Sequence, residues 1–139
     1  MLLFLYGTLM AGQPHPLARR LHAVLGPGEP GVIAGRMFAL RDPLGWYPAV
    51  VSGEGVVCGM VHRADGLDDA LLAALDAYEE VVATGPGYRR VEVIVSDGAL
   101  AQAYLWHGAL PDGARPVAEG DFAAFLSRTG QRPYGAQPS

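Results

Sequence analysis

The segment Leu2-Leu3-Phe4-Leu5-Tyr6-Gly7-Thr8-Leu9 decides the fold, because it takes a short apolar run directly into a glycine turn. The run, residues 2–6, predicts a buried strand, and Gly7-Thr8 predict the tight turn that follows it. Such a turn leaves backbone N–H groups without sheet partners, and these groups can receive a carboxylate or a phosphate. Gly7 would let the backbone approach a ligand closely. An ordinary tight turn without a ligand remains the alternative interpretation.

A second segment, Leu75-Asp76-Ala77-Tyr78-Glu79, closes the best-defined helix of the sequence, residues 67–79. At about 100° per residue, the leucines of this helix cover an arc from about 0° to about 140°, with Glu79 inside it at about 120° and Glu80 outside it at about 220°. Burial and a helix C-terminus both disfavour the charged form of Glu79, so both raise its pKa toward the range of a general acid or base. A glutamate that points to solvent or pairs with an arginine is the alternative.

The rest of the chain is mostly strands separated by turn residues. Asp65 or Asp68 is expected to cap the helix 67–79. We expect short helices at 16–25 and 121–126, a loop at 26–31, and strands at 32–40, 47–51, 56–62, 88–95 and 99–107. Strands dominate without strict βαβ alternation, which predicts an α+β fold: a curled or barrel-like mixed sheet with one main helix packed on it. The expected domain covers residues 1–129, and residues 130–139 are expected to form a loose tail.

Composition excludes several classes of protein. The 139 residues suffice for one domain, and half of them are hydrophobic, which argues against disorder. The net charge is −4 with ten Lys and Arg residues and no basic run, so nucleic acid is not an expected partner. No signal peptide or membrane span is predicted, and the expected location is the cytoplasm. Cys58 is expected to be a buried filler. The histidines show no metal-ligand spacing, so we expect neither a metal nor a cofactor: His15, His22, His62 and His107.

Five short motifs follow one another in a fixed order over roughly residues 2–107. They are Tyr6-Gly7-Thr8-Leu9, Tyr47-Pro48-Ala49-Val50, Val57-Cys58-Gly59-Met60-Val61, Leu75-Asp76-x-x-Glu79 and Tyr88-x-Arg90. Together they resemble the gamma-glutamylcyclotransferase-like superfamily, including its AIG2-like and gamma-glutamylamine cyclotransferase branches. The chain departs from the family pattern at Glu80, where glycine is frequent, and at Met60, where glutamate is frequent.

The resemblance implies a small mixed β-barrel with a cavity that takes a small-molecule γ-glutamyl substrate. It implies Glu79 as the catalytic acid and base, and a substrate-binding set of Tyr6, Gly7, Thr8, Leu9 and Tyr88. In the implied reaction, the α-amine of the γ-glutamyl unit attacks its own γ-carbonyl, which releases 5-oxoproline and an amine or amino acid. The substrate supplies the nucleophile, so this chemistry requires no metal and no cofactor.

Two rival functions stay open on the sequence. One is a non-catalytic protein of the same fold that binds a γ-glutamyl metabolite or another small carboxylate. The other is a different amide cleavage, such as removal of a γ-glutamyl protecting group. The candidates for contacting the leaving group are residues 81–87 and, secondarily, Trp46-Tyr47, for which a place in the aromatic core is the favoured alternative. These residues are apolar or flexible and offer no charge, so we expect weak selectivity for this end of the substrate.

Overall fold

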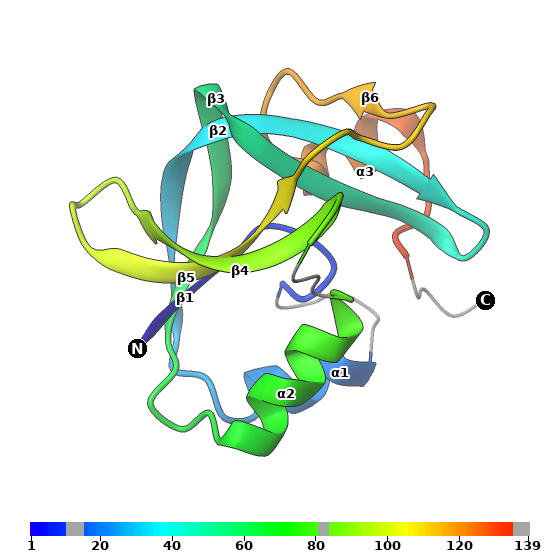
Figure 1. The fold of residues 1–139 in the computed structure, drawn as a ribbon. Coiled ribbons are helices and arrows are strands. Elements are labelled where there is room, and N and C mark those ends of the chain that lie inside the picture. The colour runs from blue at the N-terminus through cyan, green and yellow to red at the C-terminus, as the bar shows by residue number, and fades with distance from the viewer. Residues whose placement is uncertain (11–15, 81–83, 135–139) are drawn as a thin grey trace.

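The computed structural model describes residues 1–10, 16–80 and 84–134, and in them three helices surround a curled sheet of six strands (Figure 1). In chain order the elements are β1 (Leu2–Leu5), α1 (Pro16–His22), β2 (Gly28–Asp42), β3 (Gly45–Arg63), α2 (Asp69–Tyr78), β4 (Gly87–Ile94), β5 (Leu100–His107), β6 (Arg115–Pro116) and α3 (Phe122–Thr129).

The sheet is mixed, because β1 lies between a parallel and an antiparallel neighbour. The strand order is β4-β5-β1-β3-β2-β6. β1 pairs antiparallel with β3, with Leu5 opposite Met60, and parallel with β5, with Leu3 opposite Gln102. The sheet curls into a half-barrel, so the predicted α+β fold of barrel type is confirmed.

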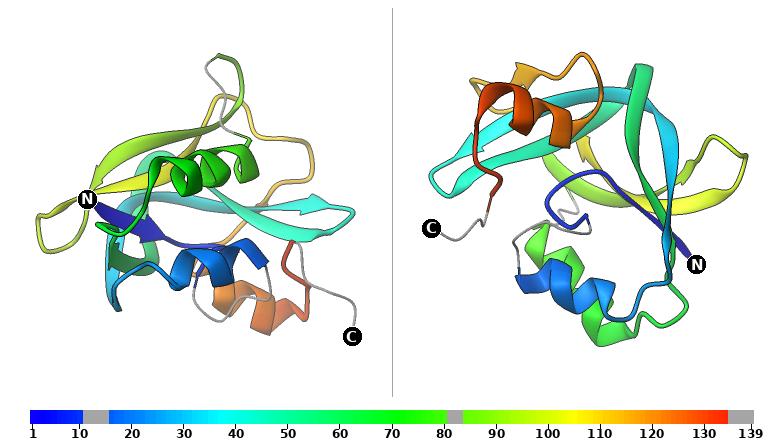
Figure 2. Two further views of the ribbon diagram at one scale, coloured as in Figure 1. Left: turned by 90° about the horizontal axis from the view of Figure 1, so that it is seen from below. Right: turned by 180° about the vertical axis from the view of Figure 1, so that it is seen from behind.

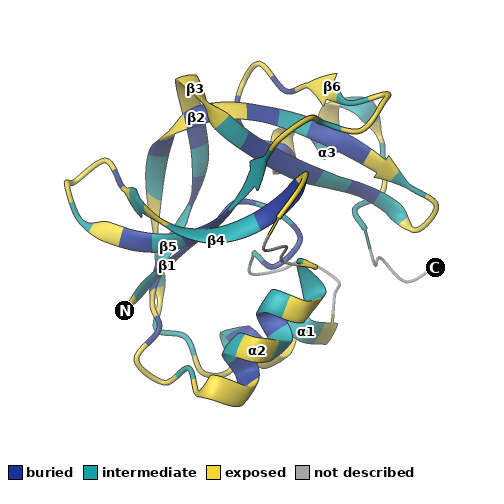
Figure 3. Cartoon of the chain, in the orientation of Figure 1, coloured by how far each residue is buried: buried dark blue, intermediate teal, exposed yellow. Residues whose placement is uncertain are grey.

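β1 is apolar throughout because both of its faces are buried. Leu3 and Leu5 pack into the cluster that includes the buried sides of α1 and α2. Phe4 and Tyr6 point to the opposite side, into the cluster that contains the aromatic residues of α3. The alternation of a strand therefore connects the two hydrophobic clusters through one short element. Exposed residues gather instead in the loops and at the start of α2 (Figure 3).

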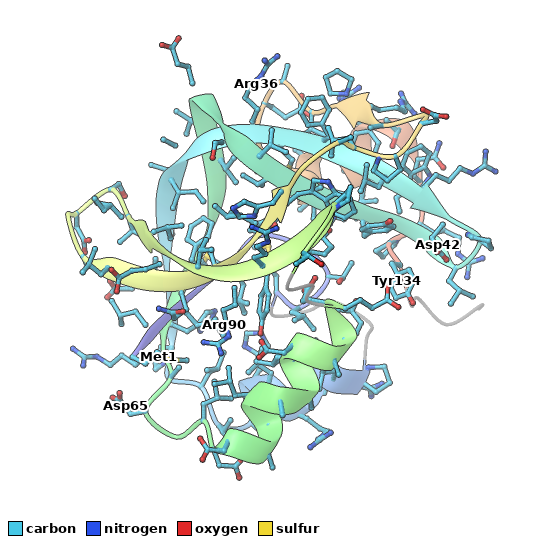
Figure 4. The ribbon with its side chains drawn as sticks, in the orientation of Figure 1. Met1, Arg36, Asp42, Asp65, Arg90 and Tyr134 are labelled. Atoms are coloured by element: carbon cyan, nitrogen blue, oxygen red, sulfur yellow. The ribbon has the colours of Figure 1, made fainter. Side chains whose placement is uncertain are left out.

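α1 and α2 lie side by side on one side of the sheet, and α3 lies on the other side, next to β2 and β6 (Figure 2). Asp68 is the cap of α2, and its Oδ1 accepts a hydrogen bond of 2.8 Å from the N–H of Leu71. Asp65, the other candidate, instead pairs with the N-terminal ammonium of Met1 at 3.1 Å (Figure 4). Among the described helices, none is long and apolar enough to cross a membrane.

Two predictions for the β2–β3 hairpin are wrong. Residues 28–31 belong to β2 rather than to a loop, because they pair with the end of β3, Gly31 opposite Gly59. The predicted break between residues 51 and 56 is also absent, since β3 runs through it as one strand. There the register shifts from Ala34–Val56 to Arg36–Val51, so that exposed residues 52–55 bulge out opposite a single glycine.

The first residues after α3 pack on the hairpin, so the prediction of a loose tail is wrong for residues 131–134. The backbone of Trp46 donates to the carbonyl of Arg132 at 2.8 Å and accepts from the N–H of Tyr134 at 2.7 Å. The indole N–H of Trp46 also donates to Gln131 Oε1 at 3.0 Å. Residues 135–139 lie outside the described residues, and the domain boundary at residue 129 stays a prediction.

Candidate active site

The turn after β1 is held by contacts on three sides. The N–H of Met10 donates to the carbonyl of Gly7 at 3.0 Å, which closes the turn, and His22 Nε2 donates to the carbonyl of Leu9 at 2.8 Å. A Cβ at position 7 would lie 2.5 Å from Cγ of Pro48, so the close approach of β3 requires glycine there. Within the described part of the chain, the N–H groups of Thr8 and Leu9 have no backbone partner.

Glu79 is the residue at which α2 ends. Its N–H completes the helix with a 3.0 Å hydrogen bond to the carbonyl of Leu75, and the chain then reverses at Glu80, whose φ is 52°. The residue after a helix often adopts this left-handed conformation and is then usually glycine. Glu80 therefore occupies a position at which glycine is the usual residue. The side-chain directions calculated for this helix are confirmed. Leu71 and Leu75 are buried, Glu79 is half-buried and Glu80 is exposed.

A hydrogen bond joins the turn to the end of α2. Oγ1 of Thr8 lies 2.5 Å from the hydroxyl of Tyr78, the residue immediately before Glu79. Thr8 is buried and Tyr78 is half-buried, so this contact is partly shielded from water. The two segments singled out in the sequence, 70 residues apart, therefore meet in the folded protein.

The meeting point is a pocket of about 260 Å³. All six residues predicted for the site line it: Tyr6, Gly7, Thr8, Leu9, Glu79 and Tyr88. The other lining residues are Phe4, Leu5, Asp42, Tyr47, Pro48, Tyr78, Glu80, Pro86, Gly87, Tyr104, Trp106 and Tyr134. The structure thus brings the predicted residues together, while their roles in binding or catalysis stay predictions.

Burial raises the pKa of Glu79 to about 8. The side chain borders the pocket, which explains its partial exposure, but protein atoms surround it on the other sides. Burial is the largest cause that raises the pKa of four tyrosines near Glu79, and the charge of Glu79 is a smaller one: Tyr6, Tyr78, Tyr88 and Tyr104. For Tyr104 the hydrogen bond to Asp76 and the charge of Asp76 raise the pKa more than Glu79 does. Within the described residues Glu79 forms no ion pair, so the alternative of an arginine partner is wrong. A carboxyl with this pKa can both accept and donate a proton near neutral pH.

Asp76 attaches α2 to the sheet from the polar side of the helix. Its Oδ1 accepts from Arg90 Nε at 3.0 Å and from the hydroxyl of Tyr104 at 2.6 Å, and its Oδ2 accepts from Arg90 Nη2 at 3.4 Å. Figure 4 shows Arg90 between the sheet and α2. The Asp76 and Arg90 motif positions therefore anchor the helix that carries Glu79.

Sequence reasoning missed part of the pocket. Asp42, Tyr104 and Tyr134 line it, although none of them was a candidate. Tyr134 lies in the predicted tail, where no periodic pattern indicates contact with the domain. Of the two aromatic candidates, Tyr47 lines the pocket, whereas Trp46 lies in the core, as the alternative for it held, with its ring centroid 5.8 Å from that of Phe125. Of the expected leaving-group loop, residues 81–83 lie outside the described residues.

No group of three or more His, Cys, Asp or Glu side chains that could hold a metal occurs in the described residues. Cys58 is free, and it is half-buried in β3 rather than fully buried as predicted. It does not line the pocket. The chemistry available in the pocket is therefore that of a protonatable carboxyl, tyrosine hydroxyls and backbone N–H groups.

Comparison with known proteins identifies a family. The sequence profile of the family described as gamma-glutamyl cyclotransferase, AIG2-like, matches residues 3–124. No curated protein matches the chain.

Solved structures share the fold. An uncharacterised protein from Pyrococcus horikoshii is 25% identical, with a TM-score of 0.61, over 94% of this chain and 96% of its own. An AIG2-like protein from Mus musculus is 20% identical, with a TM-score of 0.53, over 81% and 79% of the two chains. Allophanate hydrolase from Kluyveromyces lactis is 14% identical, with a TM-score of 0.70, over 92% of this chain but only 21% of its own.

Proposed function

Because the chain belongs to the AIG2-like gamma-glutamyl cyclotransferase family, we propose that it cyclises the γ-glutamyl group of a small amide to 5-oxoproline and releases an amine or amino acid. One observation carries the proposal. The pocket joins a carboxyl whose pKa is about 8 to a turn whose N–H groups at Thr8 and Leu9 have no backbone partner in the described chain. The two parts supply the proton transfers and the anion contacts that this reaction needs.

The turn is suited to hold the γ-glutamyl end of the substrate. Its N–H groups are fixed by β1, by Pro48 and by the His22 hydrogen bond before any ligand arrives. Fixed donors do not reorganise as negative charge develops, so they stabilise an oxyanion more than mobile donors do. We assign them to the α-carboxylate and the γ-carbonyl oxygen. Holding both groups also brings the α-nitrogen near the γ-carbon, which favours ring closure.

Glu79 carries the protons in this mechanism. As a carboxylate it takes a proton from the α-ammonium, and the freed amine attacks the γ-carbonyl carbon to form the ring C–N bond. As a carboxylic acid it then protonates the leaving nitrogen, and the amide C–N bond breaks. The ring nitrogen loses its second proton by the same route, so the amine leaves as an ammonium and the charges balance. A pKa of about 8 suits a group that works in both directions.

The test is a search for product. The protein should form 5-oxoproline from γ-glutamyl amines or γ-glutamyl amino acids and should leave α-glutamyl dipeptides untouched, because an α-linked chain removes the carboxylate that the turn would hold. Turnover of the α-linked peptide would contradict the role given to the turn. Saturable binding of γ-glutamyl compounds without 5-oxoproline would instead support the non-catalytic binding protein.

A further inference from the structure

Two consecutive arginines on β4 have opposite surroundings. Arg90 faces α2 and is paired with Asp76, whereas Arg89 forms no ion pair with any described residue. Side chains alternate between the two faces of a strand, so Arg89 points away from α2, and it does not line the pocket. Its Nε is buried and has no hydrogen-bond partner among the described residues. β4 therefore carries a guanidinium for which the described protein supplies no anion.

His107, on the neighbouring strand β5, lies on the same face of the sheet as Arg89. Leu105 is directly opposite Arg89 in the register of the two strands, and His107 follows two residues later. Leu105 packs against the hydrophobic cluster that contains the aromatic residues of α3, whereas Trp106, between Leu105 and His107, lines the pocket. Arg89 and His107 therefore share the face of β4 and β5 that is turned away from the pocket.

The imidazole of His107 also lacks a partner. Its Nδ1 is buried and makes no hydrogen bond within the described part of the chain. The residue directly across from His107 on β4 is Gly87, so that position holds no side chain. Arg89 is the diagonal neighbour of His107, at a spacing of about 7–8 Å that is within reach of long side chains. One small ligand can thus contact both side chains.

The two nitrogens need an acceptor. A buried donor without a hydrogen bond costs free energy, and it costs most when the group is charged, so native proteins rarely leave one unpaired. The guanidinium of Arg89 is always charged and can only donate, and the imidazole of His107 donates from Nδ1 in one neutral tautomer and in its cation. A water molecule can accept such hydrogen bonds, but an oxyanion also neutralises the charge.

An oxyanion fits the donors and can reach them. The planar fork of a guanidinium matches the two oxygens of a carboxylate or of a phosphate. Arg89 and His107 are both half-buried, so solvent reaches part of each residue. β4 is also an edge strand of the sheet (Figure 1), and a ligand can approach it without passing another strand on that side.

We infer that Arg89 and His107 bind a small oxyanion, a carboxylate or a phosphate, at a second site on the face of β4 and β5 that is turned away from the pocket. Arg89 supplies the charge and a fork of donors, and Nδ1 of His107 supplies a further N–H. The inference does not depend on the proposed function, because neither side chain lines the pocket.

An NMR titration of the native protein reads the site directly. The Nε–H signal of Arg89 and the ring nitrogens of His107 are followed while acetate or inorganic phosphate replaces chloride at constant ionic strength, which keeps general screening unchanged. The two sets of signals should shift together and saturate with one dissociation constant. Saturation with acetate alone assigns the site to carboxylates, and saturation with phosphate alone assigns it to phosphates. Signals that respond to neither anion would show that water fills the space and would overturn the inference.

Variants assign the binding to these two residues. Arg89→Met removes the charge and all donors, and it should weaken the binding seen at His107 by at least about tenfold. His107→Phe keeps a ring without nitrogen and should weaken binding less, because it leaves the charge in place. The matched control, Arg36→Met, makes the same change at an exposed arginine of β2 (Figure 4) and should bind like the native protein.

Thermal unfolding separates this site from the turn after β1, which could also hold an anion. A ligand that binds only the folded protein raises the Tm. The anion that saturates the NMR signals should raise the Tm of the native protein and of Arg36→Met more than that of Arg89→Met. Equal increases in all three proteins would place the anion at the turn or elsewhere and would reject the site.

Discussion

The hydroxyls of Thr8 and Tyr78 lie 2.5 Å apart, and this contact sets the position of the last turn of α2 against the glycine turn after β1. Glu79 follows Tyr78 directly, so its place beside the turn depends on how α2 packs. The candidate site is thus built at the junction of two segments that lie far apart in the sequence. The positions that hold this junction are expected to matter almost as much as the carboxyl itself.

The pH dependence of the reaction should show the raised pKa of Glu79. If the carboxylate is the base, kcat/KM should decrease as the pH falls below about 8, because the free enzyme is then protonated. In the profile of kcat the same limb should lie at lower pH, because a bound ammonium favours the carboxylate. A limb near the ordinary glutamate pKa of 4.5 in kcat/KM would contradict the assignment.

Glu79 should also destabilise the folded protein at alkaline pH. Its pKa is about 8 when folded and about 4.5 when unfolded, so between these values the native state holds a proton that the unfolded state has lost. The free energy of unfolding therefore falls as the pH rises from about 4.5 to 8. Solvent in the pocket reduces the full effect, and we expect Glu79→Gln to be more stable than the native protein by about 2–3 kcal/mol at pH 9.

Denaturant titrations at pH 4 and pH 9 check this expectation. The difference between native protein and Glu79→Gln should be small at pH 4 and should appear at pH 9. Glu80→Gln is the control, because Glu80 is exposed. Equal stability of native protein and Glu79→Gln at both pH values would show that the carboxyl is not buried in solution.

The Asp76–Arg90 pair should contribute more to stability than an ordinary surface pair. Its side chains are 32% and 29% exposed and share a network with Tyr104, whereas Arg128 and Glu119 are 55% and 37% exposed. Arg90→Gln should cost about 1–2 kcal/mol and Arg128→Gln at most about 1 kcal/mol. Unfolding in urea measures both, and kcat should fall only for Arg90→Gln, because α2 positions Glu79. Equal losses of stability in Arg90→Gln and Arg128→Gln would show that the Asp76–Arg90 pair does not anchor α2.

Gly7→Ala should disturb the turn through Pro48. The new methyl would lie 2.5 Å from a ring carbon that cannot rotate away, so either β3 or the turn must shift. We expect a loss of about 1–3 kcal/mol in stability and an increase in KM. Gly26→Ala is the matched control, because its Cβ would meet Arg63 at an ordinary 3.5 Å. A Gly7→Ala protein with native KM would show that the turn does not hold the substrate.

Local patterns predicted the two segments that matter most. β1 was readable because an apolar run before a glycine is a strong signal, and the direction of Glu79 followed from the helical period. The β2–β3 hairpin was misread because its glycines resemble turn residues. In the structure, pairing across the long hairpin overrides that local signal, and Gly55, with φ 133°, adopts a backbone conformation inside the strand that other residues rarely adopt.

Part of the pocket lining could not be predicted for another reason. Asp42, Glu80 and Tyr134 come from a hairpin, a helix end and the last described residues, and they share no spacing in the sequence. Only the tertiary arrangement brings them around Tyr47. The two carboxylates of Asp42 and Glu80 were therefore missed as pocket residues, although both are visible in the sequence.

Turnover by Glu79→Gln compared with Glu80→Gln tests the central claim most directly. The Glu79→Gln change keeps the size of the side chain but leaves a group that cannot carry a proton, so kcat for 5-oxoproline formation should fall by at least about 10²–10⁴. Glu80→Gln leaves the carboxyl of Glu79 in place, and its activity on a γ-glutamyl amide with an uncharged leaving group should stay within a few fold of the native value. Equal activity of the two variants, both being folded, would contradict the assignment of Glu79 as the acid and base of the reaction.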